Sequence, residues 1–172
     1  MDHVADAAQR LFRALSERGL RIACAESCTG GLVTAALTDI PGSSAILWGG
    51  VAAYSNECKT RLLGVPAASI ERYGAVSREI AQAMAEGMLE ASGPAGADFS
   101  LAITGIAGPD GGSAEKPVGL VWFAWRARDG SGREESARLP GDRAAVRDAA
   151  VGLSLRIAAD FVAELAPSKG RY

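Results

Sequence analysis

Segments with helical and strand-like patterns alternate along this chain of 172 residues, which predicts a three-layer α/β/α sandwich around a mixed sheet of about five strands. The helical segments repeat apolar residues every three or four positions, whereas short continuous apolar runs between them have the length of buried strands. A late Asp-Gly-Ser-Gly turn adds a hairpin, and hence antiparallel pairing. The length and the absence of a linker or internal repeat predict a single domain over residues 1–172.

The first half of the chain is predicted to hold three helices and two strands. The first helix begins near Val4, with one continuous apolar face, and ends at Gly19. The elements after it are predicted as strand 20–25, helix 30–40, strand 45–54 and helix 55–64. Gly49 and Gly50 lie inside the second strand, where glycine is expected only if another backbone or a ligand approaches closely.

The second half is predicted to end on a hairpin and a long helix. Ser77 is a helix-capping residue, and Asp142 is expected to cap the final helix, whose apolar face continues to Leu165. The elements between these caps are predicted as helix 78–92, strand 99–104, loop 105–117, strand 118–128 and strand 133–140. The loop contains too many Gly and Pro residues to form regular structure.

Composition excludes several classes of protein. A net charge of −2 is not that of a general nucleic-acid binder, which needs a basic face to neutralise phosphates. The N-terminal segment is amphipathic with early acidic residues, unlike a signal peptide, and no apolar run approaches the ~20 residues that span a bilayer. We therefore expect a cytoplasmic protein with no membrane or nucleic-acid partner.

The histidine and cysteine counts restrict the chemistry further. His3 is the single histidine, which argues against a Ser-His-Asp triad and against a His-ligated metal site. Cys24, Cys28 and Cys58 form no CxxC pair, so reduced thiols are expected and a zinc site is not. No metal and no cofactor are predicted.

The segment SCTGG (27–31) follows a predicted strand and precedes a predicted helix, and two interpretations of it remain open. Ser27 and Thr29 are typical helix-capping residues. Alternatively, Gly30 and Gly31 leave amide groups uncovered at a helix N-terminus, an arrangement that binds an anion or a developing oxyanion. Two adjacent glycines cost a helix about 1 kcal/mol each, which capping alone does not require.

Three further groups are candidates for chemistry at the same sheet edge. Without a usable histidine, a serine nucleophile needs another base, and Lys59, five residues after Tyr54, serves if burial lowers its pKa by about 3 units. Arg143 and Arg147 lie four apart on one helix face, where a guanidinium pair suits a phosphate or carboxylate. For each, an ordinary solvated surface residue is the alternative.

Seven motifs in order, AESCTGG, TDIPGSS, YSNECK, GAVS, ITGIAGPDGG, KPVGLVWFA and GDRAAVR, closely resemble the CinA C-terminal domain family over about residues 5–165. The resemblance implies a cytoplasmic bacterial hydrolase that converts nicotinamide mononucleotide to nicotinate mononucleotide and ammonia, as a homo-oligomer, expected to be a dimer. A non-enzymatic nucleotide-binding or partner-binding module linked to competence or DNA damage is the alternative.

The resemblance also implies roles for individual residues. It makes Ser27 the nucleophile and Lys59 its base, with Tyr54 assisting or orienting, in an acyl-enzyme mechanism. The residues implied to contact the substrate are Thr29, Gly30, Gly31, Thr104, Gly105, Gly108 and Arg143. Backbone amides near Gly30 and Gly31, or in the 105–112 loop, are expected to stabilise the oxyanion.

Overall fold

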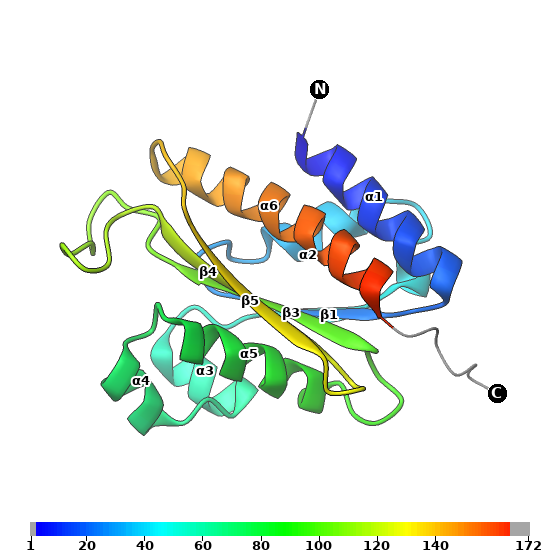
Figure 1. Cartoon of the computed structure of the whole chain (residues 1–172), viewed down its shortest axis with the longest axis horizontal. Coiled ribbons are helices and arrows are strands. Elements are labelled where there is room, and N and C mark those ends of the chain that lie inside the picture. Colours follow the sequence, from blue (N-terminus) through cyan, green and yellow to red (C-terminus); the bar gives the residue numbers. More distant parts are fainter. Residues whose placement is uncertain (1–2, 166–172) are drawn as a thin grey trace.

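The computed structural model of the chain describes residues 3–165, and its helices lie in two layers on opposite faces of one sheet (Figure 1). One layer contains α1 (His3–Arg18), α2 (Leu32–Thr38) and α6 (Arg143–Glu164). The other contains α3 (Asn56–Leu63), α4 (Ala67–Tyr73) and α5 (Arg78–Ala91). The sheet consists of β1 (Ile22–Glu26), β2 (Leu47–Ala52), β3 (Phe99–Gly105), β4 (Leu120–Ala127) and β5 (Gly132–Arg138). These layers confirm the predicted α/β class.

The sheet is mixed, with the strand order β2-β1-β3-β4-β5. Strand β1 pairs in parallel with both β2 and β3, whereas β4 and β5 form the antiparallel hairpin. The three parallel strands end at the same edge of the sheet. The segments that follow them, residues 27–31, 53–55 and 106–119, therefore meet at that edge, the usual place for a ligand in an open α/β sheet.

The two faces of the sheet carry side chains of different size. Along β3, the large Phe99, Leu101 and Ile103 pack under α1, α2 and α6. The opposite face carries small residues, such as Ala102, under α5. Small side chains let α5 lie close to the sheet, and Ser100 on that face donates a hydrogen bond to the Ala85 carbonyl of α5 at 2.6 Å.

Two short elements were not predicted, and both have simple physical reasons. Helix α4 has seven residues and buries only Ile70, so it shows no helical repeat in the sequence. A single 3-10 turn, η1 (Ser43–Ala45), lies in the connection before β2. The predicted caps are confirmed, since Ser77 accepts from the Ile80 amide and Asp142 from the Ala145 amide.

Candidate active site

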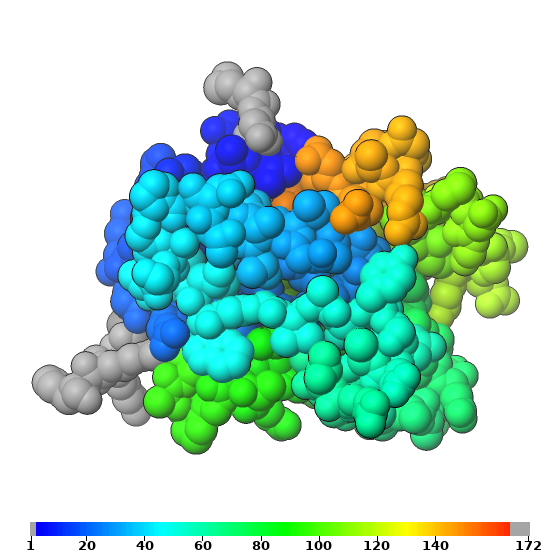
Figure 2. Space-filling model, turned by 180° about the vertical axis from the view of Figure 1, so that it is seen from behind, coloured from blue at the N-terminus to red at the C-terminus, as the bar shows by residue number. Residues whose placement is uncertain are grey.

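A cavity of about 230 Å³ opens at the carboxyl edge of the parallel strands. The residues that line it come from both helical layers and from the loops between them: Ser27, Cys28, Tyr54, Asn56, Lys59, Ala75, Val76, Thr104, Gly105, Ala107 and Arg143. In Figure 2, the segment after β2, the first turns of α6 and the 105–117 loop converge on one side of the molecule. The cavity thus joins segments that are far apart in the sequence.

Ser27 and Lys59 are in direct contact inside this cavity. The Lys59 Nζ lies 3.0 Å from the Ser27 Oγ and donates a second hydrogen bond, also 3.0 Å long, to the Tyr54 carbonyl. Lys59 is 1% exposed, and within residues 3–165 it forms no ion pair with a carboxylate. The pair is therefore a buried amine and hydroxyl, 32 positions apart in sequence.

Burial changes the acid–base properties of the groups around Ser27. Desolvation lowers the pKa of Lys59 from its ordinary value, because a buried ammonium loses its hydration; the nearby Cys28 and Cys58 act in the opposite direction. Burial raises the pKa of the Cys28 thiol to about 11, so that this neighbour of Ser27 stays protonated near neutral pH. Burial therefore makes the charged form of Lys59 less favourable than it is in water.

The Ser27 hydroxyl does not cap α2, so the capping interpretation of Ser27 is wrong. Gly31 is the N-cap residue and makes no side-chain capping bond. Instead, the buried Glu26 carboxylate accepts from the amides of Gly31, Val33 and Thr34. A carboxylate at a helix N-terminus is stabilised by the unpaired amides and the helix dipole.

This arrangement corrects the expectation that the amide of Gly31 is available for an anion. Gly31 donates to Glu26, and the Gly30 amide donates to the Ser27 carbonyl at 3.1 Å. Thr29, Gly30 and Gly31 are also absent from the lining of the cavity. The carboxylate of Glu26 occupies the place at the N-terminus of α2 where the two glycines predicted that an anion would bind.

Arg147 holds the opposite side of the same turn. Its Nε donates to the Cys28 carbonyl at 3.1 Å and its terminal nitrogen to the Thr29 carbonyl at 3.0 Å. A Cβ on Gly30 would lie 3.6 Å from this guanidinium. Arg147 therefore contacts the backbone beside Ser27, and it does not join Arg143 in one clamp.

Arg143 crosses the mouth of the cavity. Its guanidinium donates to the Gly108 carbonyl at 2.9 Å and to the Tyr54 hydroxyl at 3.1 Å. Tyr54 is 60% exposed, and Gly108 contributes its carbonyl to this bridge without lining the cavity. Deeper inside, the Thr104 hydroxyl donates to the Ala75 carbonyl. The structure thus brings Ser27, Lys59, Tyr54, Thr104, Gly105 and Arg143 to one cavity, as predicted.

Sequence reasoning missed several residues that line the cavity. Asn56 lies in the first turn of α3, three residues before Lys59, and Ala75 and Val76 belong to the connection between α4 and α5. Asn56 had a signal, because it directly follows the Tyr54-Ser55 strand end. Ala75 and Val76 lie in the GAVS motif of the family resemblance, which implied no role for them, and small apolar residues in a connection show no periodic pattern.

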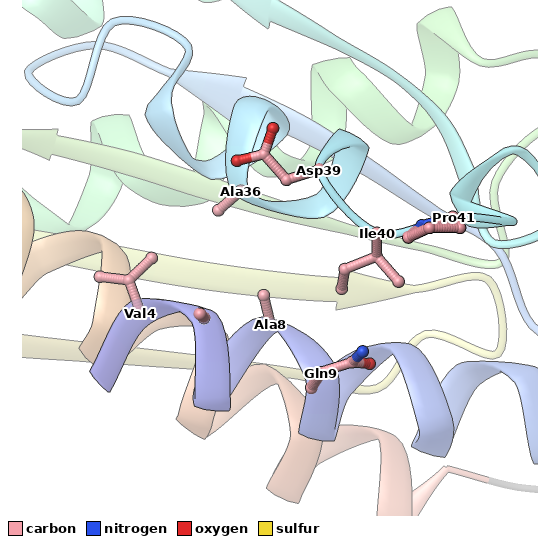
Figure 3. A pocket seen from close by; sticks show the side chains of 8 residues that line it. Val4, Ala8, Gln9, Ala36, Asp39, Ile40 and Pro41 are labelled. Carbon is pink, nitrogen blue, oxygen red and sulfur yellow. The ribbon is translucent and has the colours of Figure 1, made fainter. Parts of the chain in front are cut away.

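A second cavity, of about 240 Å³, lies between α1 and α2 (Figure 3). Val4, Ala8 and Ile40 point into the space between the helices. Its lining is mostly aliphatic, with Gln9 and Asp39 as the polar residues, and contains no serine, cysteine or lysine. It offers no chemistry comparable with that of the Ser27 cavity.

Residues 3–165 contain no cluster of three or more His, Cys, Asp or Glu side chains that could hold a metal ion. None of the helices in the same range is both long and apolar enough to cross a membrane. All three cysteines are unpaired.

The sequence pattern that defines the CinA C-terminal domain matches residues 4–162. The chain belongs to the CinA C-terminal domain family. Among curated relatives, the nicotinamide-nucleotide amidohydrolase PncC of Enterobacter agglomerans is 51% identical over 145 residues, which cover 84% of this chain and 87% of that protein. The putative competence-damage inducible protein of Desulforudis audaxviator is 52% identical over 86% of this chain, but the match covers only 35% of that longer relative.

Solved structures of the family confirm the fold. The competence/damage inducible protein CihA from Agrobacterium tumefaciens superposes with a TM-score of 0.87 at 43% identity, covering 93% of this chain and 97% of that one. A CinA superfamily protein from Klebsiella pneumoniae gives a TM-score of 0.89 at 38% identity, covering 94% and 99%. The family members therefore share this sheet and both helical layers.

Proposed function

We propose that this chain is a nicotinamide-nucleotide amidohydrolase, which converts nicotinamide mononucleotide and water to nicotinate mononucleotide and ammonia. The observation that carries the proposal is the buried Ser27–Lys59 contact of 3.0 Å, inside a cavity at the expected edge of the sheet. The likeness to PncC along most of both chains supplies the substrate. No role for a metal or cofactor is included.

The reaction proceeds through an acyl-enzyme. The neutral Lys59 amine accepts the Ser27 proton while Oγ bonds to the carboxamide carbon, and the carbonyl π electrons move to oxygen. When they return, the C–N bond breaks, and Lys59 passes the proton to the departing nitrogen, which leaves as ammonia. Water then attacks the ester carbon and gives a proton to Lys59, and this proton returns to Ser27 as the acid leaves.

The size of the cavity suits one part of the substrate, the pyridine carboxamide that reacts. Drug-sized ligand pockets usually measure about 300–1,000 Å³, so a cavity of about 230 Å³ suits the reactive pyridine carboxamide and not the whole nucleotide. The ribose and phosphate then extend towards the mouth. Arg143 lies there, and a guanidinium binds phosphate well through paired donors.

The decisive experiment measures ammonia release from nicotinamide mononucleotide by pure, EDTA-treated protein, in the wild type and in Ser27→Ala and Ser27→Asn. Because the Ser27 hydroxyl does not cap a helix, both variants are expected to remain folded and to lose several orders of magnitude in kcat. Ser44→Ala, at an exposed serine outside the cavity, is the matched control. A folded Ser27→Ala protein with near-normal turnover contradicts the mechanism, and nucleotide binding without ammonia release in the wild type favours a binding module.

A further inference from the structure

Three of the five backbone amides in the turn after β1, residues 27–31, donate to another residue, and the other two follow Ser27. The Ser27 amide donates to the Ile103 carbonyl, and the Gly30 amide donates to the Ser27 carbonyl. The Gly31 amide donates to the Glu26 carboxylate. Within residues 27–31, the amides of Cys28 and Thr29 donate to no other residue, and the Cys28 amide faces only its own thiol sulfur. Buried amides without partners are rare in proteins, so each requires an explanation. Of these two residues, only Cys28 lines the cavity.

Arg147 controls the direction of the Cys28 amide through two linked peptide groups. The guanidinium holds the Thr29 carbonyl, whose peptide group also contains the Gly30 amide. That amide donates to the Ser27 carbonyl, which belongs to the same peptide group as the Cys28 amide. In a trans peptide the N–H points opposite to the C=O, so the Cys28 N–H is directed away from the Ser27 carbonyl. Hydrogen bonds in such a chain polarise one another, and the charged donor at its start strengthens the effect.

We propose that the Cys28 amide is the oxyanion donor of this enzyme and that Arg147 is the positioning residue that orients it. The inference rests on the proposed acyl transfer at Ser27. As the Ser27 Oγ bonds to the substrate carbon, the carbonyl π electron pair moves to oxygen, and the Cys28 N–H donates to that oxygen. The residue that follows a nucleophilic serine often supplies this donor, because its amide is fixed next to the reacting carbon.

Glu26 and Arg147 both form hydrogen bonds with the backbone of the turn at residues 27–31. The Glu26 carboxylate accepts hydrogen bonds from amides at the start of α2. The Arg147 guanidinium, from α6, donates hydrogen bonds to the carbonyls of Cys28 and Thr29. The turn is therefore fixed by two charged side chains from different elements before substrate arrives. Preorganised donors of this kind need no rearrangement as the charge develops.

The first test removes one N–H and leaves the side chain unchanged. An α-hydroxy acid analogue of alanine, incorporated at position 28, replaces the amide with an ester, and Cys28→Ala is the matched control with the same side chain. We expect kcat to fall about 10²-fold from the control to the ester, with KM changed less than about threefold. An equal kcat in the two proteins overturns the assignment, as does a larger loss when the ester is placed at position 29.

The second test concerns Arg147. Arg147→Met releases both carbonyls, and we expect kcat to fall about 10²-fold with little change in KM, because the misplaced donor affects the transition state more than the bound substrate. Arg147→Lys retains the charge but has one contact point where the guanidinium has two, and an intermediate kcat is expected. Arg156→Met, an exposed arginine on the same helix, is the matched control.

If Arg147→Met does not fold, Arg147→Lys carries the test. Wild-type kcat in whichever Arg147 variant folds, or a loss confined to KM, overturns the positioning role.

A reagent that does not depend on the substrate separates this inference from the proposed function. Fluorophosphonate modifies an activated serine and places a phosphonyl oxygen where the oxyanion forms, and mass spectrometry identifies Ser27 as the labelled residue. Labelling that is slowed by the ester at position 28 and by Arg147→Met supports the inference even if the wild type releases no ammonia from nicotinamide mononucleotide. A wild type that shows neither turnover nor labelling overturns both proposals.

Discussion

Lys59 is a buried cationic side chain whose surroundings make its charged form unfavourable. Its Nζ contacts one hydroxyl and one carbonyl, and among residues 3–165 no carboxylate neutralises it. A buried ammonium without an ionic partner is expensive, and a lowered pKa is the usual response. At this position, the free-energy cost of burying the ammonium lowers the pKa of Lys59, and a lower pKa suits a general base.

Two consequences of the lowered Lys59 pKa are measurable. We expect kcat/KM to rise with pH through that pKa, and Lys59→Arg to be inactive, because a guanidinium stays protonated. The free energy of unfolding should also rise with pH, relative to Lys59→Met. Between the lowered folded pKa and the unfolded value of about 10.4, the unfolded chain binds more protons.

Denaturant unfolding and initial rates over a pH series test both expectations. Exposed Arg61 on the same helix, changed to Met, provides the control for α3 stability. More than about a tenth of wild-type kcat in Lys59→Arg contradicts the base assignment.

At the scale of elements, the contact between α2 and β2 explains the glycine pair in the second strand. A Cβ at Gly50 would lie 2.2 Å from the Thr34 Oγ1 of α2. That hydroxyl donates to the Glu26 carboxylate at 2.8 Å and so belongs to the support of the Ser27 turn. The sequence predicted a close approach to this strand, and the approaching group is a side chain of α2, not a backbone or a ligand.

Gly50→Ala is expected to reduce the free energy of unfolding by about 1–3 kcal/mol, because the added methyl group overlaps Thr34. In a Thr34→Ala background the overlap is largely removed, so the same change should cost less. Equilibrium unfolding of the two single variants and the double variant measures this coupling. Strictly additive losses show that the two side-chain positions do not interact.

At the scale of the whole molecule, the candidate site exists only because both helical layers reach one edge of the sheet. Lys59 comes from α3 in one layer, and Arg143 from α6 in the other. Arg143 joins the end of β2 to the loop between β3 and β4, through the Tyr54 hydroxyl and the Gly108 carbonyl. The mouth of the cavity therefore depends on the relative position of the layers.

Arg143→Ala tests whether this bridge also holds the substrate phosphate. Loss of a charge-assisted contact of about 1.5–3 kcal/mol should raise KM for nicotinamide mononucleotide roughly 10- to 150-fold. With nicotinamide riboside, which lacks the phosphate, the same variant should show little change. Arg138→Ala, at an exposed arginine of β5, is the control. An equal effect on both substrates contradicts phosphate binding and leaves Arg143 as a link between segments.

The class of fold, the order of most elements and six of the eleven residues that line the cavity could be predicted from the amino-acid sequence. Apolar periodicity and caps such as Ser77 and Asp142 are local signals, so they identify helices and strands without knowledge of the partner segments. Motifs such as SCTGG and YSNECK identified Ser27 and Lys59 separately. The two were predicted as a candidate pair because both follow strands at one sheet edge and no usable histidine is present, and the family resemblance implied the same roles.

The hydrogen-bond partners of the polar groups around Ser27 could not be predicted from the sequence. Glu26 was not singled out in the sequence, yet its carboxylate fills the anion position that the glycines of the turn suggested. Arg147 was expected beside Arg143 and instead holds the backbone next to Ser27. The reason is physical: hydrogen-bond partners are set by which strand ends and helices the sheet order brings together, and that order depends on contacts between residues far apart in the chain.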